Sequence, residues 1–190
     1  MKHIFILCML STGLCCASEN NIEIVKNASF ECESEERIGQ VLDNWNDCKN
    51  ASWGAFTTES NLQVVEFVCP SISTVKFFNH VKNRVPARDF VHFDIKSYQT
   101  KFAWHINSDN TIALDNISFS YRWKDALTFD NKYFGEERNE IHKSACRNKP
   151  HIDLTNAHYI DTLPETAFKD MTSNLKKMRG IFDYDPEKPQ

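Results

Sequence analysis

The chain lacks several features by which common functions are recognised in a sequence. Its 190 residues include only five glycines, each isolated from the others, so no glycine-rich loop is present to cradle a phosphate. It contains no G-x-S-x-G turn of the kind that presents a serine nucleophile. Basic residues form no extended run and the formal net charge is −4, which argues against a protein that binds nucleic acid or an anionic membrane.

The first 17 residues, by contrast, have the pattern of a secretory signal peptide. Lys2 gives a positively charged start, an apolar run follows from Ile4 to Leu14, and Cys15-Cys16-Ala17 provides a small-residue cleavage site. The run is too short to span a bilayer, and no later apolar segment is long enough either. We therefore predict cleavage near Ala17 and a periplasmic or secreted product without a membrane span.

Four cysteines remain in the mature chain. In an oxidising compartment they are expected to form disulfides rather than a metal site or a reactive thiol. Four cysteines allow three pairings, which the sequence does not settle. A helix that ends near Cys48 and leads directly into a hairpin would bring it close to Cys69, so we favour a Cys48–Cys69 bridge. That pairing leaves Cys32 and Cys146 for the second disulfide.

Composition predicts a single domain over residues 18–182 and a flexible tail over residues 183–190. Aromatic content is high, with 14 Phe, 5 Tyr and 4 Trp, which indicates a hydrophobic core rather than a disordered chain. Removal of Lys2 with the signal peptide leaves 21 Lys and Arg against 26 Asp and Glu, so the mature chain has a net charge of −5. A mildly acidic chain of this size is long enough to bury a core of its own.

Hydrophobic periodicity predicts an α+β fold, in which an N-terminal helix packs on an antiparallel β-meander and C-terminal helices close one side. An apolar stripe from Ile38 to Trp45 marks the N-terminal helix and is expected in the core. A bulge is expected near Asp115-Asn116, where the apolar phase of a strand shifts. The predicted elements are a strand at 22–25, a helix at 34–49, hairpin strands at 52–58 and 62–69, a helix at 72–83, strands at 89–96, 101–107 and 111–123, and helices at 136–146 and 161–180.

The strands at 89–96 and 101–107 suggest one cluster of potential metal ligands. If Tyr98-Gln99 is the turn between them, His92 faces His105 on the polar side of the sheet and Asp94 lies diagonal to both. Two imidazoles and a carboxylate can hold zinc or another divalent metal. We prefer the alternative that these are solvated residues alternating with a core face, because no local signature such as H-E-x-x-H accompanies them. No cofactor is therefore expected.

The aromatic residues suggest a second kind of site. A helix packed across a curved antiparallel sheet forms a cone whose open end can bind an apolar molecule. Aromatic residues on alternating strands are more often part of the core, and we favour that interpretation. The residues concerned are Trp53, Phe56, Phe67, Phe93, Trp104 and Phe119.

Three N-glycosylation sequons begin at Asn27, Asn50 and Asn116. They matter only in a eukaryotic source, and three matches are close to the number that chance delivers in an Asn-rich chain. They therefore carry no weight in the assignment.

The block from Ile24 to Cys69 resembles a loose group of small exported bacterial proteins of uncharacterised function. The group shares a strand of the type V-K-N-G-x-[LF], a helix that opens T-V-G-x-A-[LF]-D, and the pattern Cys…Trp-x-x-Phe-x-T-x-x-G-x-x-V-V-E-x-x-Cys. The chain has VKNASF, IGQVLDNWNDC and WGAFTTESNLQVVEFVC at these places, with Ala28 where Gly is usual and Asn61-Leu62 in a turn that usually contains Gly. The resemblance implies a bacterial envelope location and supports the Cys48–Cys69 pairing, and it implies no activity.

These features together predict an exported, disulfide-bonded accessory or binding protein that engages a protein partner or a small ligand, and we favour a non-enzymatic role. The alternative is an envelope enzyme, such as a metal-assisted hydrolase that uses His92, Asp94 and His105 on a curved cystatin-like or NTF2-like sheet. A large exposed apolar patch would favour the binding protein. A deep pocket with convergent histidine and carboxylate groups would favour the enzyme.

Overall fold

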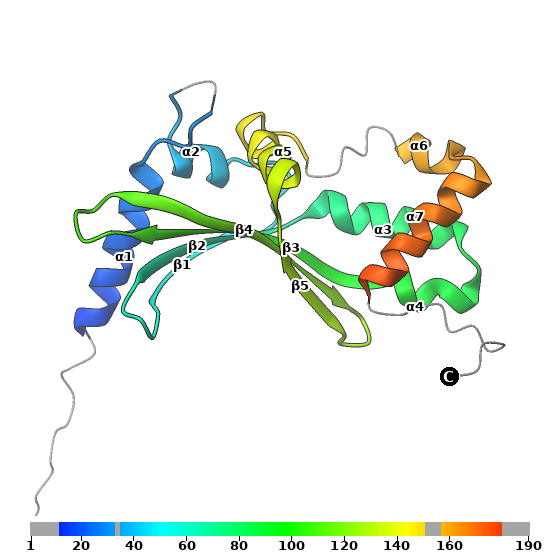
Figure 1. The fold of residues 1–190 in the computed structure, drawn as a ribbon, viewed down its shortest axis with the longest axis horizontal. Coiled ribbons are helices and arrows are strands. Elements are labelled where there is room, and N and C mark those ends of the chain that lie inside the picture. Colours follow the sequence, from blue (N-terminus) through cyan, green and yellow to red (C-terminus); the bar gives the residue numbers. More distant parts are fainter. Residues whose placement is uncertain (1–11, 33–34, 151–156, 180–190) are drawn as a thin grey trace, which may run out of the picture.

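A single antiparallel sheet forms the centre of the molecule. The computed structural model describes residues 12–32, 35–150 and 157–179. The sheet has the order β1-β2-β3-β4-β5, so that every strand pairs with the strand that follows it in sequence (Figure 1). The α+β fold with a β-meander, expected from hydrophobic periodicity, is confirmed. The strands are β1 (Ser52–Thr57), β2 (Gln63–Pro70), β3 (Ile95–Ile106), β4 (Ile112–Trp123) and β5 (Thr128–Lys132).

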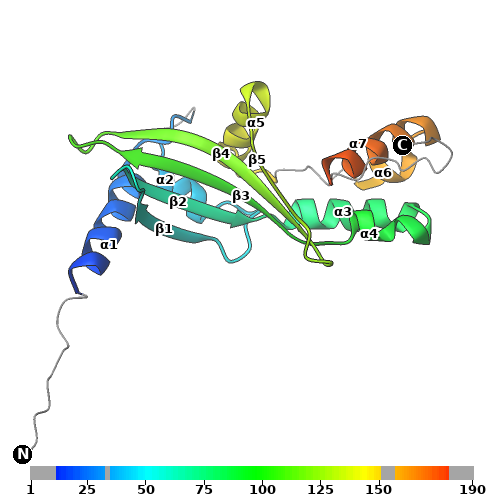
Figure 2. The same cartoon turned by 60° about the horizontal axis from the view of Figure 1, so that its bottom comes forward.

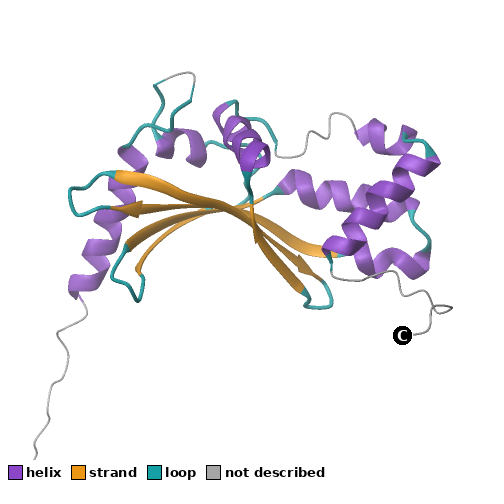
Figure 3. Cartoon of the chain, in the orientation of Figure 1, coloured by secondary structure: helices purple, strands orange, loops and turns teal. Residues whose placement is uncertain are grey.

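The helices form two groups, which Figure 3 separates by colour from the strands. In both views α3, α4, α6 and α7 lie beyond one end of the sheet, apart from α1, α2 and α5 (Figures 1 and 2). No helix within the described part of the chain is long and apolar enough to cross a membrane. The helices are α1 (Thr12–Asn27), α2 (Ile38–Asp43), α3 (Ile72–Arg84), α4 (Phe90–Phe93), α5 (Gly135–Cys146), α6 (Ala157–Thr162) and α7 (Glu165–Met178), with the 3₁₀ turn η1 (Ala87–Asp89) before α4.

Two hydrophobic cores correspond to the two groups of helices. The first core joins α1, α2 and α5 to one face of strands β1 to β4, and it includes Leu42 and Trp45. The second core joins α3, α4, α6 and α7 to the start of β3 and the end of β4, and it includes Phe78 and Trp123. Phe119 in β4 packs against both cores. The long β3–β4 pair therefore serves as a common floor for two otherwise separate clusters.

Buried polar side chains lie between the two cores. The hydroxyl of Tyr98, in the second core, hydrogen-bonds the hydroxyl of Tyr133, in the first. Burial raises the pKa of both phenols, so both stay protonated at neutral pH. Where β2 meets α3, the buried Asp47 carboxylate accepts hydrogen bonds from Ser71 Oγ (2.6 Å) and from Ser73 N (2.8 Å). These bonds satisfy polar groups that would otherwise be costly to bury at the junction.

The N-terminal region differs from the prediction. The strand expected at 22–25 is wrong, because these residues belong to α1, where Ile22 and Val25 pack against the first core. Apolar residues three positions apart fit the helical period, and so short a segment does not distinguish the two periods. The helix expected at 34–49 is reduced to the six residues of α2. Its apolar stripe from Ile38 to Trp45 is nevertheless buried, which confirms its place in the core.

Gly39 permits the close contact between α1 and α2. A Cβ atom at this position would lie 2.9 Å from Cβ of Lys26 and 3.2 Å from its carbonyl oxygen, so a larger residue would push the helices apart. The Lys26 ammonium pairs with the Asp43 carboxylate at 2.9 Å and lies 5.1 Å from the ring centre of Trp53. One side chain of α1 therefore contacts both α2 and β1.

The largest correction concerns β3. The predicted turn at Tyr98-Gln99 is wrong, since β3 runs from Ile95 to Ile106 and Tyr98 is buried within it. Neither residue has a turn preference, and β3 finds partners in both β2 and β4. The chain is therefore extended at the position where a hairpin was expected.

The residues just before β3 also differ from the prediction. They form η1 and the single-turn helix α4 instead of a strand at 89–96. Phe93 is buried in the second core, whereas Val91, expected on the same face, is exposed. The indole Nε1 of Trp123 donates a hydrogen bond of 2.8 Å to the His92 carbonyl, which holds the helical turn against β4. Tertiary contacts with Trp123 thus override the alternating pattern.

The remaining elements largely follow the prediction. The β1–β2 hairpin, α3, β4 and α5 agree with it to within a few residues, and β5 is an element that the sequence did not indicate. The expected bulge in β4 is confirmed, because the register passes from Ala103–Asn116 to Trp104–Leu114 and leaves Asp115 unpaired. The helix expected at 161–180 is divided at Pro164 into α6 and α7. The predicted tail at 183–190 and most of the signal peptide lie outside the described residues.

Candidate functional site

Two adjoining hollows lie between α5, the segment 28–32 and the packed face of the sheet. One, of about 390 Å³, reaches the sheet, and the other, of about 530 Å³, follows α5 toward Cys146. Both are lined by Glu31 and His142, and we call the two together the α5 groove. Such volumes are in the range of sites for small ligands. The lining residues are Ser29, Phe30, Glu31, Cys32, Ile38, Trp104, Ile112, Ala113, Leu114, Arg138, Asn139, His142, Lys143, Cys146 and Arg147.

The α5 groove has an apolar floor and a charged rim. Side chains of Trp104, Ile112 and Leu114 from β3 and β4 form the floor, and Trp104 is only 2% exposed. The rim contains three cationic side chains of α5 and the segment after it, and one carboxylate, that of Glu31. Arg138 donates a hydrogen bond of 3.3 Å to the Leu114 carbonyl, which holds its guanidinium at the edge of the sheet. The groove therefore offers apolar surface and positive charge side by side.

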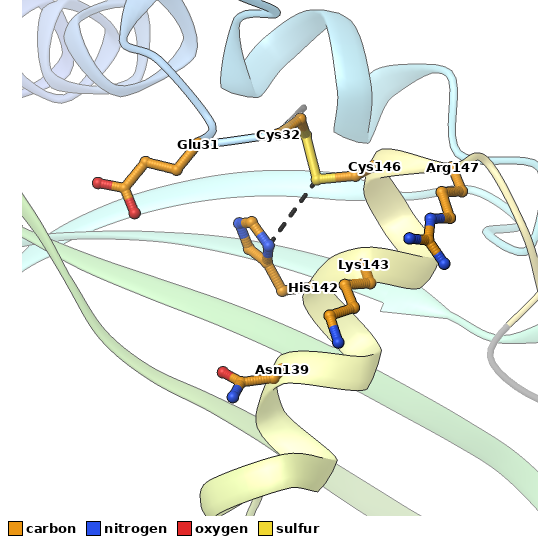
Figure 4. Close-up of a pocket in the computed structure, with 7 residues that line it drawn as sticks. All are labelled: Glu31, Cys32, Asn139, His142, Lys143, Cys146 and Arg147. Carbon is orange, nitrogen blue, oxygen red and sulfur yellow. Dashed lines mark hydrogen bonds between the residues drawn. A yellow bond between two sulfur atoms is a disulfide. The ribbon is translucent and has the colours of Figure 1, made fainter. Parts of the chain in front are cut away.

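His142 lines both hollows, and Figure 4 shows it among the residues that line the hollow of about 530 Å³. Its ring centre lies 4.4 Å from that of Phe30, with the two rings tilted by 35°, and its Nε2 is 2.8 Å from the Phe30 carbonyl oxygen. Its Nδ1 is 3.8 Å from Cys146 Sγ. Burial lowers the pKa of the imidazole, an effect that the Phe30 carbonyl and Glu31 oppose and Arg138 reinforces. His142 is thus predominantly neutral at pH 7 and fixed in orientation from two sides.

Glu31 reaches the α5 groove through an unusual backbone conformation. Its φ angle of 55° lies in the left-handed region, which side chains other than glycine rarely adopt. The residue directly precedes Cys32, whose disulfide ties this segment to the end of α5. Conformations of this kind persist where surrounding contacts impose them, and they are concentrated at functional sites. The strained residue is therefore a further reason to consider the groove as a site.

Both disulfides favoured from the sequence are present. Cys48 pairs with Cys69 where the region after α2 meets the end of β2, and Cys32 pairs with Cys146 at the end of α5. The two differ in surroundings, because Cys69 is completely buried in the first core whereas Cys32 and Cys146 are half-buried and line the α5 groove. One disulfide is thus anchored in the core through Cys69, and the other is part of a wall of the candidate site.

The structure does not bring His92, Asp94 and His105 together. Their proximity depended on a hairpin turn at Tyr98-Gln99, and without it Asp94 and His105 are separated by almost the whole of β3, roughly 30 Å or more along an extended strand. Within the described residues, no three His, Cys, Asp or Glu side chains are grouped so that they could hold a metal ion. The arrangement inferred from the sequence is corrected accordingly.

Each member of that set has a different environment. Asp94 pairs with the ammonium groups of Lys124 (2.8 Å) and Lys82 (2.9 Å), which hold the pKa of its carboxyl below the usual value. His105 lies on the face of β3 opposite the first core and is half-exposed. His92 belongs to α4, where its carbonyl binds Trp123. Asp94, which lies between α4 and β3, therefore links α3 to the β4–β5 turn through two structural ion pairs.

The aromatic residues expected in the core are divided. Phe67, Phe93 and Trp104 are buried, as predicted. Phe56 is 47% exposed because it lies on the face of β1 opposite Trp53, away from the first core. For Trp104 the two alternatives, a core residue or part of a ligand site, coincide. It belongs to the first core and also lines the floor of the α5 groove.

Sequence reasoning missed the central residue of the α5 groove. His142 precedes Cys146 by four positions, which places the two side chains on one face of any helix, and this spacing was an available signal. Arg138 lies four positions before His142 and continues the same face. The contribution of Glu31 and of the β3–β4 floor had no local signal, because these residues are far from α5 in the sequence.

Comparison with known proteins gave no guide to the role of this groove. No protein-family model, curated protein or solved structure matches the chain.

Proposed function

We propose that the protein is an exported binding protein that holds a small amphiphilic anion in the α5 groove. The observation that carries the proposal is the combination, in one groove, of an apolar floor built by Trp104, Ile112 and Leu114 with a predominantly cationic rim. An apolar ligand body would be favoured by the floor, and a carboxylate or similar headgroup by the guanidinium of Arg138.

The size and rigidity of the groove support this role. Its two hollows, of about 390 and 530 Å³, would accommodate a ligand with a short alkyl chain or a ring system. Its walls are fixed by the Cys32–Cys146 disulfide and by the bond from Arg138 to the sheet. A site whose walls are already ordered loses less conformational entropy when a ligand binds.

Export to the periplasm or to the medium is part of the proposal. Two disulfides are consistent with an oxidising compartment outside the cytoplasm. Cleavage near Ala17 would remove the first residues of α1 and keep Ile22 and Val25, which pack on the first core. The resemblance of residues 24–69 to small exported bacterial proteins supports a bacterial envelope location for the mature chain.

Calorimetric titration with octanoate, a simple amphiphilic anion, tests the binding function. We expect octanoate to bind the mature protein and its uncharged analogue octanamide to bind at least about tenfold more weakly, because the rim favours a negative charge. Arg138→Gln should weaken octanoate binding by a similar factor. Arg122→Gln is the matched control, since Arg122 is an exposed arginine of β4 that does not line the groove, and it should leave the affinity unchanged.

Native mass spectrometry of the protein isolated from the compartment of export provides the second readout. A retained small molecule that is lost in Arg138→Gln would support the proposal. Equal octanoate affinity of the two arginine variants would overturn it. So would absence of octanoate binding together with a protein that carries only another polypeptide chain, because the engaged molecule would then be a protein partner.

A further inference from the structure

The wall of the α5 groove places an imidazole against a disulfide. His142 and Cys146 are one turn apart in α5, and Nδ1 of the histidine lies 3.8 Å from Sγ of the cysteine (Figure 4). The other ring nitrogen, Nε2, is 2.8 Å from the Phe30 carbonyl oxygen. A carbonyl oxygen only accepts, so in the neutral ring Nε2 carries the proton and Nδ1 presents its lone pair to the sulfur.

We propose that Cys32–Cys146 is a thiol–disulfide exchange site, in which His142 stabilises Cys146 as a thiolate. The chemical class of its co-reactant is a dithiol, such as the reduced cysteine pair of another exported protein. The inference stands independently of ligand binding in the groove, because it depends only on the disulfide, the imidazole and access to them.

The surroundings of this disulfide fit exchange better than those of the other. Cys32 and Cys146 line a hollow of about 530 Å³, whereas in the second bridge Cys69 is completely buried and Cys48 packs, partly buried, against the first core. Lys143 and Arg147 line the same hollow. Cationic side chains and a neighbouring imidazole favour the thiolate form of a cysteine, which is the form that leaves and attacks in exchange.

Other charged groups around the imidazole are balanced. Glu31, on the segment opposite α5, favours the protonated ring, and Arg138, one turn earlier in α5, disfavours it. Lys143 is engaged by Glu140 at 2.9 Å. The neutral imidazole that results can accept a proton at Nδ1 when a thiol enters the hollow.

The proposed exchange has two steps. The first thiol of the co-reactant gives its proton to Nδ1 of His142 and attacks Cys32 Sγ, forming a mixed disulfide while the Cys32–Cys146 bond breaks with its electron pair on Cys146. The imidazolium then faces the Cys146 thiolate and stabilises it. The second thiol attacks the co-reactant's sulfur in the mixed disulfide and releases Cys32, which takes up the second proton. Overall the dithiol is oxidised to a disulfide, Cys32 is reduced to a thiol, and Cys146 is reduced to a thiolate that is paired with the His142 imidazolium and becomes a thiol when it takes up that proton.

Timed reduction of the mature protein tests the exchange site, with the second disulfide as an internal control. The protein is treated with dithiothreitol at pH 7, quenched with N-ethylmaleimide, and the labelled cysteines are identified by peptide mass spectrometry. We expect Cys32 and Cys146 to be labelled at least about tenfold faster than Cys48 and Cys69. Equal rates, or faster labelling of Cys48 and Cys69, would overturn the proposal.

Variants of His142 distinguish a chemical role from mere exposure of the disulfide. His142→Phe keeps an aromatic ring next to Phe30 and removes Nδ1, and it should slow labelling of Cys32 and Cys146 several-fold. His80→Phe, in α3, is the matched control and should leave the rate unchanged. An unchanged rate in His142→Phe would limit the disulfide to a structural bridge that happens to be accessible, and the proposal would fail.

The pKa of the Cys146 thiol is the readout that a structural role would not move. In Cys32→Ser, pH-dependent alkylation should give a Cys146 pKa clearly below the ordinary thiol value of about 8.5. Addition of His142→Phe should return it toward that value. If Cys32→Ser does not fold, the same titration is made on the wild-type protein after brief reduction. An ordinary pKa in either form would contradict the proposal.

Discussion

The half of the molecule built around α1, α2 and α5 contains both disulfides, whereas the half built around α3, α4, α6 and α7 is joined by charged side chains. Cys32, Cys48, Cys69 and Cys146 all belong to or pack against the first core. In the second half, Asp94 pairs with two lysines, and the guanidinium of Arg84 lies 4.1 Å from the ring centre of Phe168. The two cores share one sheet and are fastened by different chemistry.

Arg179 shows how the second half is held together without a covalent bond. It follows α7, is only 9% exposed, and donates a hydrogen bond of 2.6 Å to the Val91 carbonyl of α4. It also pairs with the Asp125 carboxylate in the β4–β5 turn and lies 5.3 Å from the ring centre of Trp123. One arginine thus joins the end of α7 to α4 and to the sheet.

The difference has a physical reason in the local structure. The first half includes short α2 and long connections, whose freedom in the unfolded chain a disulfide restricts. The second half consists of helices that already satisfy their own backbone bonds and need only be oriented against one another. We therefore expect the first half to depend on oxidation and the second to depend on charge.

The largest expected effect is that of Trp45→Ala, which tests whether the first core is as tightly packed as the structure indicates. Trp45 is 2% exposed, packs edge-on against Phe102, and donates a hydrogen bond of 2.7 Å to the Lys149 carbonyl. Its removal should lower the free energy of unfolding by about 3–5 kcal/mol in a denaturant titration. Trp53→Ala, at a half-buried position, should cost less. A loss below about 1 kcal/mol for Trp45→Ala would mean that the residue is not part of a packed core.

The second prediction breaks one covalent connection of the first half. Replacement of both Cys48 and Cys69 by Ala should lower the free energy of unfolding by about 2–4 kcal/mol, because the unfolded chain gains conformational freedom. Amide hydrogen exchange should show the loss of protection mainly in α2, β1 and β2. Equal loss in α3 and α7 would show that the two halves unfold as one unit.

The third prediction is the counterpart in the second half. Arg179→Met should lower the free energy of unfolding by about 1–3 kcal/mol, since the charge-assisted hydrogen bond to Val91 and the contact with Trp123 are lost. Amide exchange should increase in α4 and α7 and remain unchanged in α2. Lys177→Met, at an exposed position two residues earlier, is the control and should be close to neutral. Similar values for the two variants would contradict the role given to Arg179.

A fourth prediction uses pH to separate the halves. The pKa of Asp94 is lowered by Lys124 and Lys82, and that of Asp125 by Arg179, so each carboxylate is more acidic in the folded than in the unfolded chain. The stability that these two carboxylates give the folded chain is complete above their ordinary pKa of 3.8 and is lost as the pH falls through the pKa of the folded state. Burial lowers the pKa of His142 below 6.5 in the folded chain. The contribution of the neutral imidazole to the free energy of unfolding is therefore complete above pH 6.5 and is lost as the pH falls through the folded pKa.

Amide exchange at a series of pH values measures this separation. Protection in α5 and α2 should begin to decline below pH 6.5, and protection in α4 and at the end of β4 only below pH 3.8. The first decline should disappear in His142→Phe and the second should become smaller in Asp94→Asn. If protection declined at the same pH in both halves, the proposed difference between them in pH dependence would be wrong.

The smallest expected effect concerns coupling between the cores. Leu42→Ala in the first core and Val81→Ala in the second should be additive to within about 0.5 kcal/mol in the free energy of unfolding, because the two residues belong to separate clusters. A larger coupling energy would show that the β3–β4 floor makes the two cores one.

Local patterns predicted the elements whose burial they directly reflect. The stripe from Ile38 to Trp45, the β1–β2 hairpin and the β4 bulge near Asp115 are found as expected, since each follows from which side chains face the core. The alternation at 89–96 failed because contacts with the second core decide that segment, among them a hydrogen bond from Trp123, which is 31 residues away from His92. The metal ligands suggested there depended on that register, and without it His92, Asp94 and His105 are not brought together.

The α5 groove shows the limit of sequence reasoning most directly. The spacing of His142 and Cys146 is visible in the sequence, but the floor from β3 and β4 and the carboxylate of Glu31 come from segments that only folding assembles. A sequence pattern reports the period of one element, whereas a site needs the relative positions of several.

Local sequence patterns indicate the parts of the protein: a secretory signal pattern, an aromatic-rich α+β chain with meander periodicity, and four mature cysteines for which one pairing was favoured. Tertiary packing sets how these parts are arranged in space. It divided the apolar residues between two cores, extended β3 through the expected turn, and set His142 against one disulfide while burying Cys69 of the other. The physical reason is that periodicity reflects burial of one face, whereas partners far apart in the sequence are chosen by packing and hydrogen bonding of the whole chain.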